Sequence, residues 1–213
     1  SSSYKAIQIC NQYLAEFQGL TFDELKLNDD YRAQMFRYTN SFKEARFLRA
    51  YFYFNLVRAY GDVPYFTEMV TTDQVNSLTR TPAQEIFNAI IAECDKLSTE
   101  LPADYTKLGL DGIAPAENGR VTCYAALALK ARAALYAASP LFNPENNKDL
   151  WRRAAEANKE VIETCTANGF KLSKYSELWG PNNWSNNEMI FVRRYNGNIS
   201  TLEEYNFPMG VPG

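Results

Sequence analysis

Apolar residues recur at helical spacing over the first four-fifths of this 213-residue sequence, and this periodicity restricts the fold more than any other feature. Residues 42–60 carry two apolar stripes, one through Phe42 and Leu48 and one through Phe47 and Tyr51. A helix with two apolar stripes has to be covered on two sides, so we expect this helix to lie inside the protein.

A second helix is predicted for residues 82–100. Thr81 can serve as its N-cap, Pro82 suits the first helical position, and Gln84 would complete a capping box. Apolar residues then repeat along one face, and Pro102 lies just beyond the expected end.

Three further helices are expected at residues 4–17, 121–138 and 150–168. The second of these contains eight alanines, and small side chains let neighbouring helices approach closely. The apolar side of the third includes Trp151 and Ile162.

Paired in order, the helices form two hairpins, 42–60 with 82–100 and 121–138 with 150–168. Such pairs resemble an α-solenoid of the tetratricopeptide type. We therefore predict a mainly α fold in which residues 1–170 form a tetratricopeptide-like helical scaffold.

The sequence changes character after Gly169. The following residues are rich in asparagine, and a short strand is expected at Met189–Val192. The chain ends in turn-forming residues, as though cut inside a long loop. We therefore expect residues 171–213 to be an irregular, truncated ligand-loop region, and the chain to be one fragment of a larger single domain.

Composition excludes several classes of function. The chain has no histidine, which removes Ser-His-Asp and Cys-His nucleophile systems, histidine metal sites and histidine-ligated haem. Twenty-two Lys and Arg residues against 25 Asp and Glu leave a net charge of −3, without the basic excess that nucleic-acid binding needs. No glycine-rich phosphate loop and no converging carboxylate pair is visible, so neither an enzyme nor a cofactor or metal site is expected.

The four cysteines are widely spaced and form no CxxC pair. Cysteine is among the most buried residue types, so small buried side chains are the favoured interpretation and a disulfide is the alternative. No apolar stretch approaches the about 20 residues that span a bilayer.

Arg46 and Arg49 lie within a densely aromatic helix. Because a guanidinium is costly to desolvate without partners, we expect both to form ion pairs or to bond backbone carbonyls at a helix junction. Ligand binding at this place is the alternative.

Aromatic and amide residues alternate in the loops after the last helix, where no helical stripe requires them. An exposed ring can stack on the apolar face of a sugar while an amide bonds its hydroxyls. We therefore predict that Trp184, Tyr195, Asn196 and Tyr205 bind a ligand. Packing of these loops onto the helices is the competing interpretation.

Two long motifs resemble the SusD/RagB family of surface nutrient-binding lipoproteins. They are EARFLRAYFYFNLVRAYGDVPYF at residues 44–66 and GRVTCYAALALKARAALYAASPLFNP at residues 119–144, in the order and spacing of the family. YKAIQICNQYL near the start, TPAQEIFNAIIAECDKL and NEMIFVRRY also look like elements of the family. The resemblance covers essentially the whole chain.

The resemblance implies non-catalytic binding of an oligosaccharide or polysaccharide at the cell surface and its delivery to a SusC-like TonB-dependent transporter. It implies a surface-exposed lipoprotein of the outer membrane, held by an N-terminal lipid anchor that is not present in this chain. A peptide- or protein-binding protein of the RagB type is the alternative, and an intracellular tetratricopeptide adaptor is a further one.

Overall fold

The computed structural model describes residues 2–110, 119–178 and 186–192, and these are mainly helical. The helices are α1 (Ser2–Glu16), α2 (Tyr31–Tyr60), the single turn α3 (Thr72–Val75), α4 (Ala83–Glu100), α5 (Cys123–Ala138) and α6 (Lys148–Ala167). Short 3-10 turns are η1 (Asp23–Leu25), η2 (Tyr105–Lys107) and η4 (Tyr175–Glu177). The predicted mainly α fold is confirmed.

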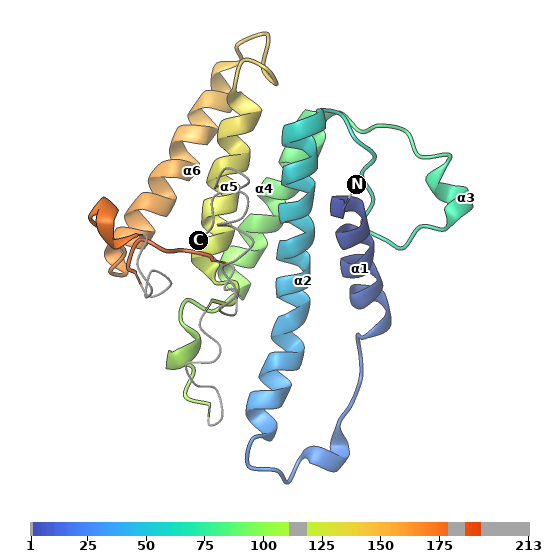
Figure 1. Ribbon diagram of the computed structural model, residues 1–213, viewed down its shortest axis with the longest axis vertical. Coiled ribbons are helices and arrows are strands. Elements are labelled where there is room, and N and C mark those ends of the chain that lie inside the picture. Colours follow the sequence, from blue (N-terminus) through green and yellow to red (C-terminus); the bar gives the residue numbers. More distant parts are fainter. Residues whose placement is uncertain (1, 111–118, 179–185, 193–213) are drawn as a thin grey trace, which may run out of the picture.

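The five long helices form a row in which each packs on the next (Figure 1). α1 packs on α2, α2 on α4, α4 on α5, and α5 on α6. Both predicted hairpins are present, as α2 with α4 and α5 with α6, and the row is the expected helical superhelix. α3 lies in the long connection between α2 and α4, away from the row.

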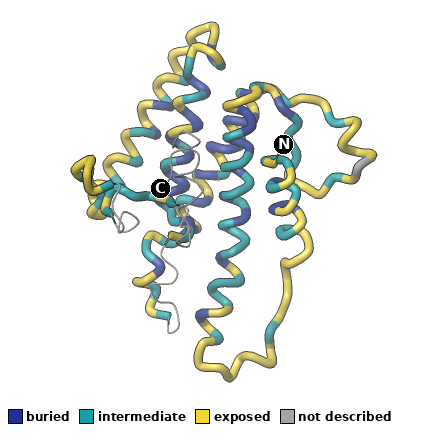
Figure 2. The backbone as a smooth tube through the Cα atoms, in the orientation of Figure 1, coloured by how far each residue is buried: buried dark blue, intermediate teal, exposed yellow. Residues whose placement is uncertain are grey.

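The alanines of α5 explain how it fits between two neighbours. Ala133, Ala134, Ala137 and Ala138 are fully buried. Because their side chains are small, α4 and α6 can both pack closely on this helix. Burial is concentrated in the middle of the row and falls toward the outer helices and the connection between α1 and α2 (Figure 2).

The start of α4 differs from the prediction. Its N-cap residue is Pro82, and no side-chain capping bond of the predicted box forms. Thr81 instead bridges to Val63, donating its backbone N–H to the Val63 carbonyl at 2.9 Å. Asp62 replaces the predicted cap, because its carboxylate accepts the Ala83 N–H at 2.8 Å. The capping-box prediction is therefore wrong.

The predicted strand at Met189–Val192 is also wrong. A turn at Asn187 and Glu188 precedes them, Ile190 and Phe191 form a bend, and none of the four residues is in a strand. The Asn186 side-chain oxygen accepts the Glu188 N–H at 2.9 Å, and the Asn186 carbonyl accepts the Met189 N–H at 3.0 Å. Such local bonds offer the backbone an alternative to pairing with a strand.

All four cysteines are free thiols. Cys10, Cys94 and Cys165 are buried and Cys123 is half-buried. Burial raises the pKa of each thiol, that of Cys94 to about 12. The interpretation as small buried side chains is confirmed for the three buried residues.

Arg46 and Arg49 both join α2 to neighbouring elements, as expected. Arg46 pairs with two carboxylates of α4, those of Glu93 and Glu100, each at 2.6 Å. Arg49 donates to the Asn11 side-chain oxygen at 2.9 Å and to the Thr67 carbonyl at 2.8 Å.

We expect Arg46→Ala to lower the free energy of unfolding by about 1–3 kcal/mol, because both carboxylates lose their cation in a partly desolvated junction. Urea denaturation measures the change. The matched control is Arg152→Ala, whose pair with Asp149 is exposed and should be worth less than about 1 kcal/mol. Equal effects of the two substitutions would contradict this role of Arg46.

Candidate functional site

The four predicted ligand-binding residues, Trp184, Tyr195, Asn196 and Tyr205, lie outside the described residues, and their role stays a prediction. The stretch between two of them, residues 186–192, is described. It lines a pocket that is larger than another one between α2 and α4.

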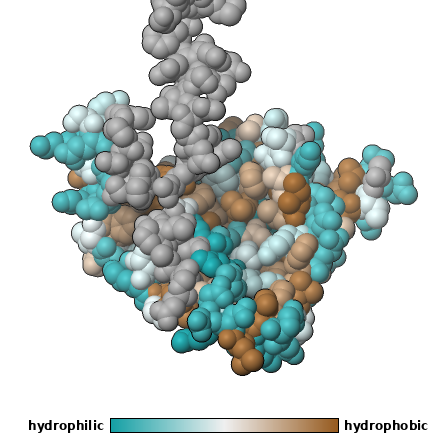
Figure 3. Space-filling model, turned by 60° about the horizontal axis from the view of Figure 1, so that its bottom comes forward, coloured by the Kyte–Doolittle hydropathy of each residue, from teal (hydrophilic) through white to brown (hydrophobic). Residues whose placement is uncertain are grey.

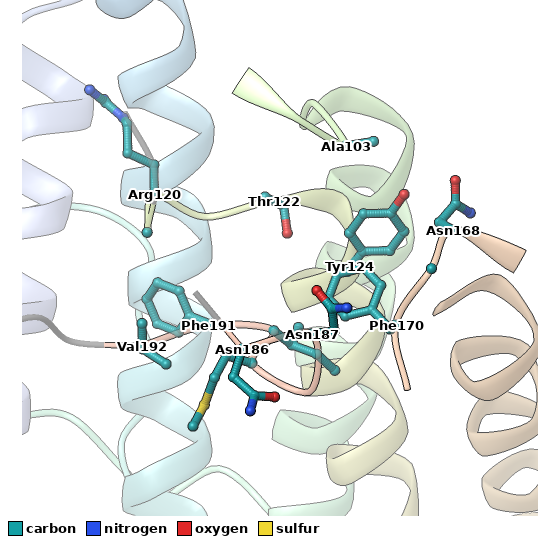
Figure 4. A pocket seen from close by; sticks show the side chains of 14 residues that line it. Ala103, Arg120, Thr122, Tyr124, Asn168, Phe170, Asn186, Asn187, Phe191 and Val192 are labelled. Atoms are coloured by element: carbon teal, nitrogen blue, oxygen red, sulfur yellow. The ribbon is translucent and has the colours of Figure 1, made fainter. Parts of the chain in front are cut away.

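This pocket has a volume of about 350 Å³ and is formed by four separate parts of the chain (Figure 4). Ala103 follows α4, a second part leads into α5, a third follows α6, and the fourth is the 186–192 stretch. The lining residues are Ala103, Gly119, Arg120, Thr122, Tyr124, Asn168, Gly169, Phe170, Asn186, Asn187, Met189, Ile190, Phe191 and Val192.

Aromatic rings form part of the pocket wall. Tyr124 and Phe170 meet edge to face with ring centroids 4.8 Å apart. Phe191 meets Phe47 of α2 in the same manner at 5.4 Å, and 39% of Phe191 remains exposed. The rings are therefore held in place by other rings, and Phe191 keeps surface that a ligand can contact.

Two polar side chains of the lining residues lack hydrogen-bond partners among the described residues. The Thr122 hydroxyl oxygen is buried and has no hydrogen-bond partner among the described residues. Thr122 is the N-cap residue of α5, yet its side chain makes no capping bond. The side-chain amide of Asn187 is exposed and makes no hydrogen bond within the described part of the chain. The neighbouring Asn186 differs, because its side-chain oxygen accepts hydrogen bonds from the Ser173 hydroxyl and the Glu188 N–H.

Arg120 fixes the stretch that leads into α5, and its side chain points away from the other lining side chains (Figure 4). Its guanidinium pairs with Glu44 of α2 at 2.8 Å. Glu44 also accepts from the buried Asn40 amide at 2.7 Å, and Tyr105 donates to the Val121 carbonyl at 2.6 Å. This network ties one wall of the pocket to α2.

The chemistry of the pocket suits a neutral, polar ligand. Arg120 is the one charged residue among the described lining residues, and its charge is matched by Glu44. Burial raises the pKa of Tyr124, so its hydroxyl stays protonated near neutral pH. Hydroxyl and amide groups beside rings can bind a polyhydroxylated molecule. Within the described ranges, no cluster of acidic or thiol groups is arranged to hold a metal ion.

Thr122, Tyr124 and Asn187 were not identified from the sequence. The asparagine-rich composition pointed only to the loops after the last helix, residues 180–198, as a whole. Thr122 and Tyr124 begin an alanine-rich helix, and the helical pattern alone assigns Tyr124 to the core.

Two features of the molecular surface complete the description. On the face shown in Figure 3, hydrophobic and hydrophilic residues are intermixed over the surface drawn in colour. None of the helices in the described part of the chain has the length and apolar character needed to cross a membrane.

The chain is similar to known proteins over most of its length. A family profile described as "Starch-binding associating with outer membrane", SusD-like, matches residues 1–135. SusD-like protein P2 of Formosa agariphila is 26% identical over 203 residues, which are 93% of this chain and 34% of that protein.

Solved structures show the same fold. A SusD-like carbohydrate-binding protein of Bacteroides fragilis has a TM-score of 0.66 and 27% identity, covering 89% of this chain and 31% of the other. A laminarin-binding SusD-like protein has a TM-score of 0.65 and 26% identity, covering 89% of this chain and 35% of the other. The chain thus spans about a third of the length of these relatives. It belongs to the SusD-like family.

Proposed function

We propose that this protein binds a neutral glycan without catalysing a reaction. The observation that carries the proposal is the 350 Å³ pocket, which combines aromatic rings with unpartnered hydroxyl and amide groups. The relatives support it, since one is described as carbohydrate-binding and another as laminarin-binding.

We further propose delivery of the glycan to a SusC-like TonB-dependent transporter by a surface-exposed lipoprotein of the outer membrane. The family description, with its association with the outer membrane, supports this placement. Co-purification of the protein with such a transporter from outer membranes, after mild detergent extraction, tests the partnership.

Asn187→Ala and Tyr124→Phe are expected to weaken glycan binding about threefold to tenfold, because each removes a hydrogen-bonding group from the pocket at little cost to packing. Calorimetric titration with laminarin and maltose oligosaccharides measures the affinity. Asn76→Ala, in an exposed loop that does not line this pocket, is the matched control and should bind normally. Unchanged affinity in both pocket variants would remove the pocket from the binding site.

The predicted residues outside the described ranges are tested in the same titration. Trp184→Ala, Tyr195→Ala and Tyr205→Ala should each weaken binding about fivefold or more, because a stacked ring contributes about 1 kcal/mol, while melting stays nearly unchanged. Asn196→Ala should weaken binding by loss of a hydroxyl contact. Lower melting with unchanged affinity would show that these side chains pack on the scaffold.

A further inference from the structure

A second, smaller pocket lies between α2, α4 and the connection that follows α2. Its volume is about 120 Å³, so it has room for a small group and is much smaller than the first pocket. The lining residues are Arg46, Arg49, Ala50, Tyr53, Tyr65, Thr67, Ala89, Ile90 and Glu93. None of them lines the larger pocket.

Arg49 lines this pocket and keeps a free hydrogen-bonding edge. One terminal nitrogen, Nη1, donates to Asn11 and to the Thr67 carbonyl, both neutral oxygens. Nε and Nη2 have no acceptor among the described residues, and no carboxylate there pairs with this guanidinium. The Nε and Nη2 hydrogens are parallel, and this edge of a guanidinium binds a carboxylate through two hydrogen bonds.

The charges around the pocket are not balanced. Lys43, Arg46 and Arg49 lie along α2, and Glu93 and Glu100 lie on α4. Arg46 pairs with both carboxylates, while Lys43 donates to the Glu100 backbone carbonyl at 2.8 Å. Arg46 is therefore matched by carboxylates, whereas Arg49, the other cation that lines the pocket, pairs with no carboxylate among the described residues.

The other walls suit the carbon part of a small ligand. Ala50, Ala89 and Ile90 provide small apolar surface. The Tyr53 and Tyr65 rings lie 4.5 Å apart, and the Tyr53 hydroxyl is already bonded to the Phe66 backbone. The Tyr65 hydroxyl makes no hydrogen bond within the described ranges, so it can donate to a ligand.

We propose that this pocket binds a carboxylate group, held through two hydrogen bonds by the Nε and Nη2 edge of Arg49 and by the Tyr65 hydroxyl. The volume admits the carboxylate with a short carbon stem. Its source is either a free small carboxylic acid or the carboxylate of an acidic sugar. The proposal does not depend on the binding of a neutral glycan in the larger pocket.

The direct test follows the Arg49 Nε–H signal of the wild-type protein by NMR. The protein is titrated with sodium acetate, sodium glucuronate, glucose or sodium chloride at constant ionic strength. We expect acetate, glucuronate or both to shift this signal with saturation, and glucose and chloride to leave it unchanged. A shift of the signal with acetate would show that a free small carboxylic acid is enough for binding. A shift with glucuronate and not with acetate would show that the ligand is an acidic sugar. No saturable shift with either carboxylate, or an equal shift with chloride, would overturn the proposal.

Variants provide the second measurement. Arg49→Lys keeps the charge but loses the paired donors, and Tyr65→Phe loses only a hydroxyl, so each should weaken binding of the responding carboxylate roughly threefold to tenfold. Arg152→Lys, on the exposed side of α6, is the matched control. Circular dichroism checks that each variant is folded. If Arg49→Lys does not fold, Tyr65→Phe and the titration of the wild-type protein still test the proposal. Unchanged affinity of Tyr65→Phe for the carboxylate would show that the Tyr65 hydroxyl does not bind it.

Discussion

Replacement of Ile86 by alanine is expected to lower the free energy of unfolding by about 2–5 kcal/mol. Ile86 lies on α4, which packs between α2 and α5, and its side chain is fully buried in the core. Truncation removes buried apolar surface and leaves a cavity that closely packed helices can only partly fill. Urea denaturation gives the change in free energy, and thermal melting should show a clear fall.

Ile162→Ala is the matched control for this experiment. The substitution is the same and also lies within a helix, α6, but 63% of Ile162 is exposed. Its effect should stay below about 1 kcal/mol. A loss at Ile86 as small as that at Ile162 would contradict the packing of α4 at the centre of the row.

Glu44→Ala is expected to lower the free energy of unfolding by about 2–3 kcal/mol and also to weaken ligand binding at the larger pocket. Glu44 accepts from Arg120 and from the buried Asn40 amide, so its removal leaves both donors without this acceptor. The ion pair is partly exposed, with 16% of the Glu44 side chain and 29% of the Arg120 side chain accessible, which keeps the effect below that of a fully buried pair.

The effect on binding has a separate physical reason. Arg120 belongs to the stretch that lines the pocket, and its pair with Glu44 is one of the bonds that attach this stretch to α2. Denaturation and calorimetric titration of the same variant measure the two effects. Glu163→Ala, which removes an exposed partner of Lys159, is the control and should change neither quantity appreciably. Normal binding by a destabilised Glu44→Ala would show that the attachment serves stability alone.

The sequence determined the positions of the long helices because helix formation depends on patterns within a few turns. The predicted 82–100 helix is α4 (Ala83–Glu100), and the predicted 150–168 helix is α6 (Lys148–Ala167). α2 was the largest departure, since it begins at Tyr31 and was expected from residue 42. In the first turn of α2, Ala33 is buried against Tyr105, which is far away in the sequence. The apolar stripes of residues 42–60 give no sign of this contact.

The sequence also indicated which polar groups needed partners, without identifying those partners. Arg46 had to be satisfied because a half-buried charge is costly without a counter-charge. Its pairing with Glu93 and Glu100, 47 and 54 residues away, depends on how α2 and α4 pack.

Only the tertiary structure decided which apolar side of each helix is covered. Trp151 and Ile162 lie on the predicted apolar side of α6, yet 37% and 63% of these residues are exposed, because α6 ends the row of described helices and α5 covers one side of it. Asp62 similarly caps α4 from 21 residues away, where no local pattern indicates it.

The pocket depends in the same way on contacts between distant parts of the chain. The whole of α5 and α6 lies between Thr122 and Asn187 in the sequence, and both residues line one pocket because these two helices return the chain to the same place. Local periodicity determines where helices form and which residues are apolar. The surfaces that meet, and therefore the site, follow from the packing of the whole row, which minimises exposed apolar area over contacts far apart in the sequence.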